Sequence, residues 1–68
     1  MPVQIRVNDD ELTLADGATV ADLVRHFDLP PQRVAVEVNE RLVRRATYAE
    51  TRLSPGDRVE IVTLVGGG

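Results

Sequence analysis

The fold is decided by residues 54–68, which read SPGDRVEIVTLVGGG. Proline followed by glycine at the centre of residues 54–57 is typical of a type II turn, because proline fixes φ at the first central position and glycine adopts positive φ at the second. Beyond this turn, residues 58–64 are predicted to form the last strand, since aliphatic and β-branched residues dominate them. The three glycines, residues 66–68, follow this predicted strand and are not expected to belong to the folded domain.

The apolar residues of this strand do not keep a simple alternation. Val59 and Ile61 take the inward phase, but apolar residues continue where polar ones are expected on the open face. We expect an exposed apolar patch beside the glycines, which would mark a binding surface. The alternative is a bulge or a strand that is covered on both faces. The predicted partner-binding residues of this patch are Val62, Leu64 and Val65.

The N-terminal residues 3–14 are predicted to form a β-hairpin. Apolar residues alternate with polar ones over residues 3–7 and again over residues 11–14, and the Asn and Asp residues at 8–10 favour a turn. Because this hairpin and the strand over residues 58–64 give the clearest strand signals, we expect the last strand to lie centrally in the sheet, beside the first.

A short helix is predicted to follow the hairpin. Thr19 and Asp22 have the spacing of a capping box, and Pro30-Pro31 is expected to end the helix. A helix of about nine residues is unstable alone in water, so its apolar stripe must pack on the sheet. The stripe consists of Val20, Leu23, Val24 and Phe27, at positions i, i+3, i+4 and i+7.

The middle of the chain predicts a third strand over residues 34–38 and a short returning strand over residues 41–43. Residues 44–50 are expected to form an irregular or helical turn with Tyr48 as a small anchor. The predicted fold class is therefore α+β, with one helix across one face of a small mixed sheet. We expect residues 1–65 to form this domain and residues 66–68 to form a flexible tail.

Composition excludes several classes of function. The 68 residues carry a net charge of −3 and only two aromatic residues, which disfavours binding to nucleic acid. The absence of cysteine removes disulfides, thiolate metal sites and thiol nucleophiles, and one histidine cannot complete a triad or a metal site. Nothing resembles a signal peptide or a membrane-spanning run, so we expect a cytoplasmic chain with no membrane partner.

The remaining polar clusters are poor candidates for catalysis. The carboxylates at residues 9–11 are interpreted as a solvated turn, and His26 as a surface or half-buried structural histidine. Arg44-Arg45 could bind an acidic group of a partner, but a solvated pair is the simpler interpretation. All eight basic residues are arginine, so no side-chain amine exists to accept an isopeptide bond.

The glycine tail is the remaining candidate for chemistry. Gly66 and Gly67 carry no Cβ, so they could thread a channel too narrow for other residues. The α-carboxylate of Gly68 would then be the least hindered functional group of the molecule. The alternative from composition is a terminus without function.

Several segments together resemble the ThiS/MoaD group of ubiquitin-like sulfur carriers. The resemblance covers the whole chain and implies a β-grasp fold and a carrier role in making the thiazole moiety of thiamine. The segments are the leading strand that ends in Asn8, Gly17-x-Thr19-Val20, VAVEVN at residues 34–39, LSPGDRVEIV at residues 53–62, and VGGG at residues 65–68.

The resemblance also implies how the tail works. An E1-like adenylyltransferase would use ATP and Mg²⁺ to activate the carboxylate of Gly68, and a persulfide from a cysteine desulfurase or from the activating enzyme would displace AMP and leave a thiocarboxylate. Thiazole synthase would then take the sulfur. In this scheme the chain is a co-substrate, not an enzyme, and it binds no cofactor or metal of its own. Gly66 and Gly67 thread the tail while Val62, Leu64 and Val65 dock on partners.

Two other functions remain open from the sequence. Within the same fold, the chain could be the sulfur-carrier subunit of molybdopterin synthase or a carrier for amino-acid biosynthesis. In a different class, it could be a ubiquitin-like protein modifier or a plain interaction module.

Overall fold

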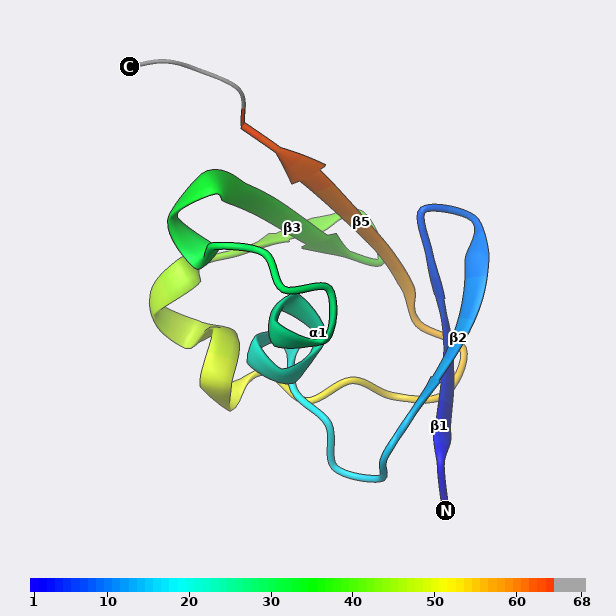
Figure 1. Cartoon of the computed structure of the whole chain (residues 1–68). Coiled ribbons are helices and arrows are strands. Elements are labelled where there is room, and N and C mark those ends of the chain that lie inside the picture. Colours follow the sequence, from blue (N-terminus) through cyan, green and yellow to red (C-terminus); the bar gives the residue numbers. More distant parts are fainter. Residues whose placement is uncertain (65–68) are drawn as a thin grey trace.

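Among the described residues, five strands form one mixed sheet in the order β2-β1-β5-β3-β4, and one α-helix packs against it (Figure 1). The structure, a computed structural model, describes residues 1–64. The predicted roles of Val65, Gly66, Gly67 and Gly68, and the predicted domain boundary after residue 65, therefore lie outside the described residues. The strands are β1 (Val3–Val7), β2 (Asp10–Leu14), β3 (Val34–Val38), β4 (Arg41–Val43) and β5 (Arg58–Thr63).

The last strand lies in the centre of the sheet, as predicted. β5 runs parallel to β1 on one side and antiparallel to β3 on the other. The turn before it also has the predicted form, because Gly56 has φ of +85° and the Asp57 N–H donates to the Ser54 carbonyl at 3.0 Å. The mixed sheet with one helix on one face is the arrangement expected for a β-grasp fold.

Two hairpin turns flank β5 and both require left-handed backbone. Asn8 and Asp9 have φ of 48° and 73°, and Asn39 and Glu40 have φ of 53° and 70°. Positive φ at both central residues is the type I′ geometry, whose twist matches that of the paired strands. Asparagine tolerates this conformation better than most residues, which explains its place at the start of each turn.

The side chains of the two turn asparagines also bind β5. The Asn8 carboxamide accepts a hydrogen bond from the Ile61 N–H at 2.9 Å and donates one to the Ile61 carbonyl at 3.1 Å. On the other side of the strand, Asn39 accepts from the Arg58 N–H at 3.0 Å and donates to the Asp57 carboxylate at 2.9 Å. The two turns therefore hold the register of the central strand from both sides.

The helix α1 (Val20–His26) begins with the predicted capping box. The Thr19 hydroxyl accepts from the Asp22 N–H at 3.2 Å, and the Asp22 carboxylate accepts from the Thr19 N–H at 2.9 Å. These bonds satisfy main-chain donors that a helix start leaves free. The first three residues of the predicted stripe, Val20, Leu23 and Val24, are buried.

The predicted end of the helix was wrong, and so was the inclusion of Phe27 in the buried stripe. The helix ends at His26, because Asp28 takes φ of 57° and its N–H donates to the Arg25 carbonyl at 2.9 Å. The Leu29 N–H donates to the Val24 carbonyl at 3.1 Å, which completes a Schellman motif before the prolines are reached. Phe27 is left 43% exposed, and Leu29 packs against the core instead.

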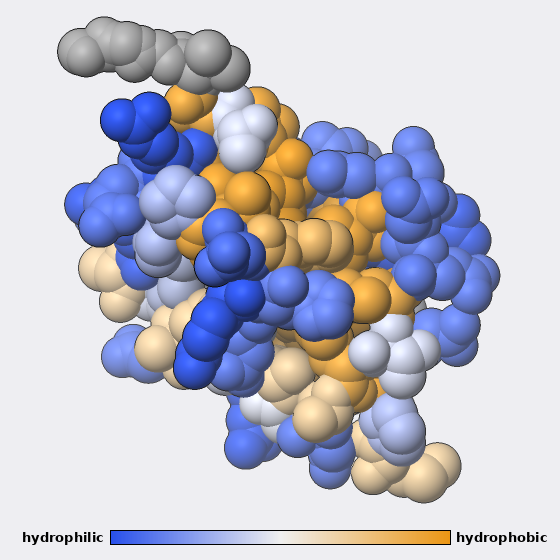
Figure 2. Space-filling view, in the orientation of Figure 1, coloured by the Kyte–Doolittle hydropathy of each residue, from blue (hydrophilic) through white to orange (hydrophobic). Residues whose placement is uncertain are grey.

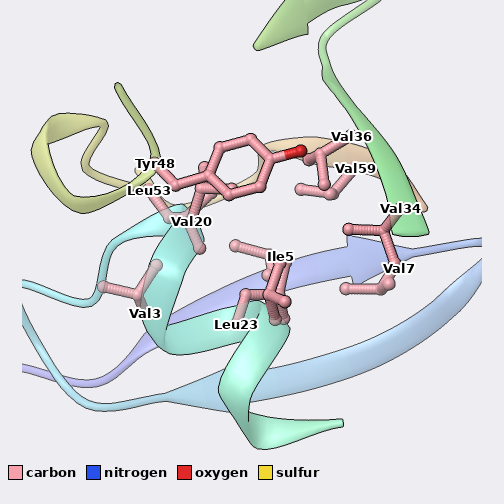
Figure 3. Close-up of a cluster of buried hydrophobic side chains, with 11 residues drawn as sticks. Val3, Ile5, Val7, Val20, Leu23, Val34, Val36, Tyr48, Leu53 and Val59 are labelled. Atoms are coloured by element: carbon pink, nitrogen blue, oxygen red, sulfur yellow. The ribbon is translucent and has the colours of Figure 1, made fainter. Parts of the chain in front are cut away.

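The core between the helix and the sheet is almost entirely aliphatic. Ile5, Leu23 and Val36 are at most 2% exposed, and the surrounding buried side chains are mainly valines (Figure 3). Tyr48 is the aromatic member of this cluster, and Figure 3 shows its ring lying across the cluster toward Val36 and Val59. It comes from the 3₁₀ helix η2 (Arg45–Glu50), which confirms the predicted helical turn and its anchor.

A second 3₁₀ helix, η1 (Pro31–Arg33), begins at the second proline and was not predicted. Proline suits the first position of such a turn because its missing N–H would have had no partner there. Among residues 1–64, no helix has both the length and the apolar character needed to cross a membrane.

The hydrogen bonds of Asn8 lead to a prediction about stability. Asn8→Asp keeps the acceptor for the Ile61 N–H but places a second oxygen against the Ile61 carbonyl, so we expect the free energy of unfolding to fall by about 1 kcal/mol. Asp9→Asn is the matched control, because asparagine tolerates the positive φ of that position. Urea unfolding at neutral pH measures both variants, and equal midpoints would contradict the bridging role of Asn8.

The capping box leads to a prediction about pH. Hydrogen bonds from the Thr19 N–H and then from the Thr19 hydroxyl hold the pKa of Asp22 below its ordinary value of 3.8. The stability contributed by the ionised carboxylate is therefore present above pH 3.8 and is lost as the pH falls through the lower folded-state pKa. We expect Asp22→Asn to be less stable than the natural chain at neutral pH and to lose less stability on acidification. Urea unfolding at a series of pH values tests this, and parallel curves would contradict it.

Candidate functional site

Two large apolar side chains are exposed at the C-terminal end of β5 and at the residue that follows it. Val59 is 1% exposed and Ile61 is partly buried against the core, whereas Val62 and Leu64 are 55% and 54% exposed. The break in alternation is therefore a true surface feature, and neither a bulge nor cover on both faces accounts for it. The prediction that Val62 and Leu64 are exposed is confirmed, while their role in binding partners stays a prediction.

This exposure follows from the position of the helix. Because α1 covers one face of the sheet, residues of β5 that alternate with Val59 and Ile61 point to the other face. Ala35 lies directly opposite Val62 in the neighbouring strand and is too small to cover it. Apolar side chains on an uncovered face are typical of a docking surface. In the orientation of Figure 1, hydrophobic surface also runs from the middle of the molecule to the end at which β5 finishes (Figure 2).

A row of three side chains crosses the open face next to this apolar pair. Glu37 lies directly opposite Glu60 of β5 on one side and opposite Leu42 of β4 on the other. Like charges in directly opposite positions oppose pairing slightly, so this row is not optimised for stability. Leu42 is 68% exposed and was not singled out from the sequence. The sequence signal that could have identified Leu42 was an apolar residue next to the partly buried Val43 on a strand of only three residues.

The last described residue is still tied to the fold. The Leu64 N–H donates to the Arg33 carbonyl in η1 at 2.7 Å. This bond follows β5, which ends at Thr63 in the structure, one residue earlier than predicted. The chain is therefore held against η1 up to the point where the described residues end, and η1 fixes the place from which the tail starts.

The other polar clusters do not converge on a common point. The Glu11 carboxylate accepts from the Gln4 amide at 2.8 Å and lies 3.8 Å from the Arg6 guanidinium. The His26 ring packs edge-on against Phe27, with ring centroids 5.0 Å apart. Arg44 and Arg45 are exposed at the start of η2. Within residues 1–64, no three or more His, Cys, Asp or Glu side chains are grouped so that they could hold a metal ion.

A hollow of about 410 Å³ lies on the helix side of the sheet, between α1 and η2. Its wall is mostly apolar, with alanines of both helices beside Val24, Leu29 and Tyr48. Charged side chains also line the hollow, but its lining residues do not include a nucleophile paired with a base. The described surface is therefore better suited to binding a partner at the end of β5 than to catalysis.

The comparisons with known proteins agree with this geometry. A family model described as "ThiS family" matches residues 2–68, a range that includes the three glycines. The sulfur carrier protein ThiS of Bacillus subtilis is 38% identical over 53 residues, which cover 78% of this chain and 80% of the relative. The small archaeal modifier protein 2 of Haloferax volcanii is 40% identical over 58 residues, which cover 85% of this chain and 80% of the relative.

A different kind of relative is a thiazole synthase of Paramagnetospirillum magneticum. It is 32% identical over 66 residues, which cover 97% of this chain but only 20% of the relative. The chain thus spans one part of a much longer protein in that organism.

Solved structures show the same fold. The crystal structure of the thiamine biosynthesis protein ThiS from Geobacter metallireducens matches with a TM-score of 0.77 and 30% identity, covering 97% of this chain and all of the other. A ubiquitin of Caldiarchaeum subterraneum, at 23% identity and a TM-score of 0.55 over the whole of this chain and 98% of the other, shows the shared ubiquitin-like β-grasp fold. With the family match over residues 2–68, these findings show that the chain belongs to the ThiS family.

Proposed function

We propose that this chain is a sulfur carrier for the thiazole ring of thiamine and that the α-carboxyl group of Gly68 carries the sulfur. The family match over residues 2–68 is the observation that carries this proposal. The exposed Val62 and Leu64 at the end of β5 support it, because they stand where a partner would approach the start of the tail.

The first step would activate the carboxylate, which is a poor electrophile. One carboxylate oxygen of Gly68 attacks the α-phosphorus of ATP in the site of an E1-like adenylyltransferase, and pyrophosphate leaves as its Mg²⁺ complex. The product is an acyl-adenylate. ATP and Mg²⁺ are thus bound by the partner, and the carrier supplies the attacking oxygen.

The second step would exchange oxygen for sulfur. The terminal sulfur of a persulfide attacks the acyl carbon, and AMP leaves. A second thiol of the partner then attacks the new disulfide bond, which releases the thiocarboxylate and leaves a disulfide on the partner. Because this chain has no cysteine, every thiol in the step belongs to another protein, such as a cysteine desulfurase or the activating enzyme.

Thiazole synthase is the proposed recipient of the sulfur. The thiazole synthase of Paramagnetospirillum magneticum contains a region similar to 97% of this chain, which makes up 20% of its own length. Joining a carrier to its acceptor raises the effective concentration of one for the other, so the fusion supports a partnership between the two kinds of protein. The carrier presents the reacting group, and the partners supply the catalysis. A cytoplasmic location stays a prediction.

The docking surface has an energetic role in this scheme. Ordering four residues of the tail in a narrow channel costs roughly 4–8 kcal/mol. Val62 and Leu64 are already half buried, so covering the rest of both side chains returns only about 2–3 kcal/mol in total. Further main-chain contacts with the partner must therefore contribute to binding.

The mass of the reacted chain tests the proposed function. We expect incubation with a cognate adenylyltransferase, ATP, Mg²⁺, a cysteine desulfurase and cysteine to replace one oxygen of the chain by sulfur, seen as a shift in intact mass. A variant that lacks Gly67 and Gly68 keeps every strand of the described sheet, so it should fold, and it should show no shift. Failure of the natural chain to react, with an adenylyltransferase that converts another carrier, would refute the proposal.

The exposed apolar pair gives a second, separate expectation. Val62→Thr combined with Leu64→Thr should raise the KM for adenylation about tenfold, because the partner can no longer bury two aliphatic side chains there. Threonine suits a strand, so the free energy of unfolding should change by about 0.5 kcal/mol or less.

Phe27→Ser is the matched control for this double variant. Phe27 is also a large exposed apolar residue, 43% exposed, but it follows the helix and does not lie on the open face of the sheet. Its replacement should leave the KM within about twofold. Equal KM values for the double variant and the control would show that Val62 and Leu64 do not dock.

A second candidate function is that of a protein modifier, favoured by the likeness to the archaeal modifier protein. The activation step is the same in both functions, and the acyl acceptor differs. A modifier would form amide-linked adducts on other proteins, which peptide mass spectrometry of the host detects, whereas a carrier would appear as a thiocarboxylate.

A further inference from the structure

The main-chain groups of β5 alternate between two neighbours. The Val59 carbonyl accepts from the Asn8 N–H at 2.9 Å, on the side of β1. The Arg58 carbonyl accepts from the Asn39 N–H at 2.7 Å, on the side of β3. Odd-numbered residues of β5 therefore direct their N–H and C=O groups toward β1, and even-numbered residues direct theirs toward β3.

On the β1 side, pairing within the chain stops at Ile61. β1 ends at Val7, and the main chain turns away at Asn8. The Asn8 carboxamide takes the place of one more residue of β1, because it binds both the N–H and the carbonyl of Ile61. Figure 1 shows β5 continuing past the β1–β2 turn toward the C-terminus.

Thr63 is the next residue whose main-chain groups face this side. It lies opposite Val34 in β3, at a position whose N–H and C=O do not take part in the β3 ladder. Within residues 1–64, the structure gives these two groups no hydrogen-bond partner, and Thr63 is exposed. On the β3 side, by contrast, the bond from Leu64 to Arg33 keeps the strand extended.

The geometry points to a docking edge: we propose that the free main-chain edge of β5 at Thr63 pairs with an extended segment of the enzyme that activates the tail. This inference rests on the proposed function, which requires the tail to enter that enzyme. An unpaired strand edge offers a donor and an acceptor at fixed spacing and is a common template for β-strand addition. Asn8 acts as a positioning residue, since its carboxamide ends the internal ladder two residues before the free edge.

The edge is continuous with the proposed docking surface. The neighbours of Thr63 in the chain are Val62 and Leu64, whose side chains point to the open face. A partner segment beside Thr63 would thus bind main chain at the edge while another part of the same partner covers the two apolar side chains. The bond between Leu64 and Arg33 sets the strand geometry that both contacts need.

Proline at position 63 tests the edge directly. Thr63→Pro removes the N–H that faces the partner but no hydrogen bond that the described chain makes, and proline is tolerated at such edge positions. We expect this variant to raise the KM for adenylation about tenfold, the effect of one lost hydrogen bond, with kcat nearly unchanged. Thr63→Val is the matched control, which keeps the N–H and the branched side chain and should stay within about twofold.

Amide hydrogen exchange of the natural chain gives a readout that does not depend on a variant. The Thr63 amide should exchange quickly in the free carrier and become protected in its complex with the adenylyltransferase. The Ile61 amide, which is bonded to Asn8, should already be protected in the free carrier. Fast exchange at Thr63 in the complex, or equal KM values for the proline and valine variants, would overturn the proposal.

The outcomes separate this inference from the proposed function. If the natural chain and Thr63→Val are both converted to the thiocarboxylate while Thr63→Pro reacts as well as they do, the carrier function stands and the docking edge fails. If the natural chain is not converted by an active enzyme, the carrier function fails and the docking edge fails with it.

Discussion

The structure depends on the placement of one strand, β5, between two neighbours of opposite direction. Its pairing with β1 is parallel and its pairing with β3 is antiparallel, so residues that are distant in sequence must meet before the strand is stable. The parallel register with β1 covers only two residue pairs. The Asn8 carboxamide lengthens that contact by binding both main-chain groups of Ile61, and Asn39 binds Arg58 and Asp57 on the other side. The side chains of two turn residues therefore extend the hydrogen bonding of β5, because a carboxamide offers the same donor and acceptor as a peptide group.

The same strand contributes both to the core and to the exposed apolar surface. Its first half, around Val59, belongs to the aliphatic core, whereas Val62 near its end and Leu64 just beyond it are half exposed on the open face. A small domain buries a modest share of its surface, so it cannot easily spare large aliphatic side chains from its core. The exposure of two such side chains where the tail begins would be explained if another protein covered them. The hydrogen bond between Leu64 and Arg33 holds this part of the chain straight without burying it.

The scheme assigns different tasks to the body and to the tail. In that proposal, the body would be the part whose shape a partner recognises, and the glycines would let the reacting carboxyl group enter a narrow site. In the proposed scheme, the enzymes that receive the tail would perform the catalysis. Such a division would suit successive partners, since each could bind the same exposed end of β5 and then act on the same carboxyl group.

Much of the fold and part of the site could be predicted from the sequence alone. The hairpin, the capping box at Thr19 and the turn before β5 depend on local patterns, so composition and spacing determined them. The central place of β5 was expected because this strand and the hairpin gave the clearest strand signals, but its pairing with β1 and β3 joins distant segments. The exposure of Val62 and Leu64 also followed from the break in alternation. The end of the helix did not, because Asp28 adopts positive φ and closes a Schellman motif before the prolines can act.

Only the tertiary structure decided the contacts between distant segments. The carboxamide of Asn8 reaches a residue 53 positions away in the chain, and no periodicity in the sequence can indicate such a bond. The exposure of Leu42 and the free edge at Thr63 likewise depend on which strands are neighbours and on where each one stops. Local preference determines elements because it acts within a few residues, whereas edges and faces exist only once the elements have been assembled.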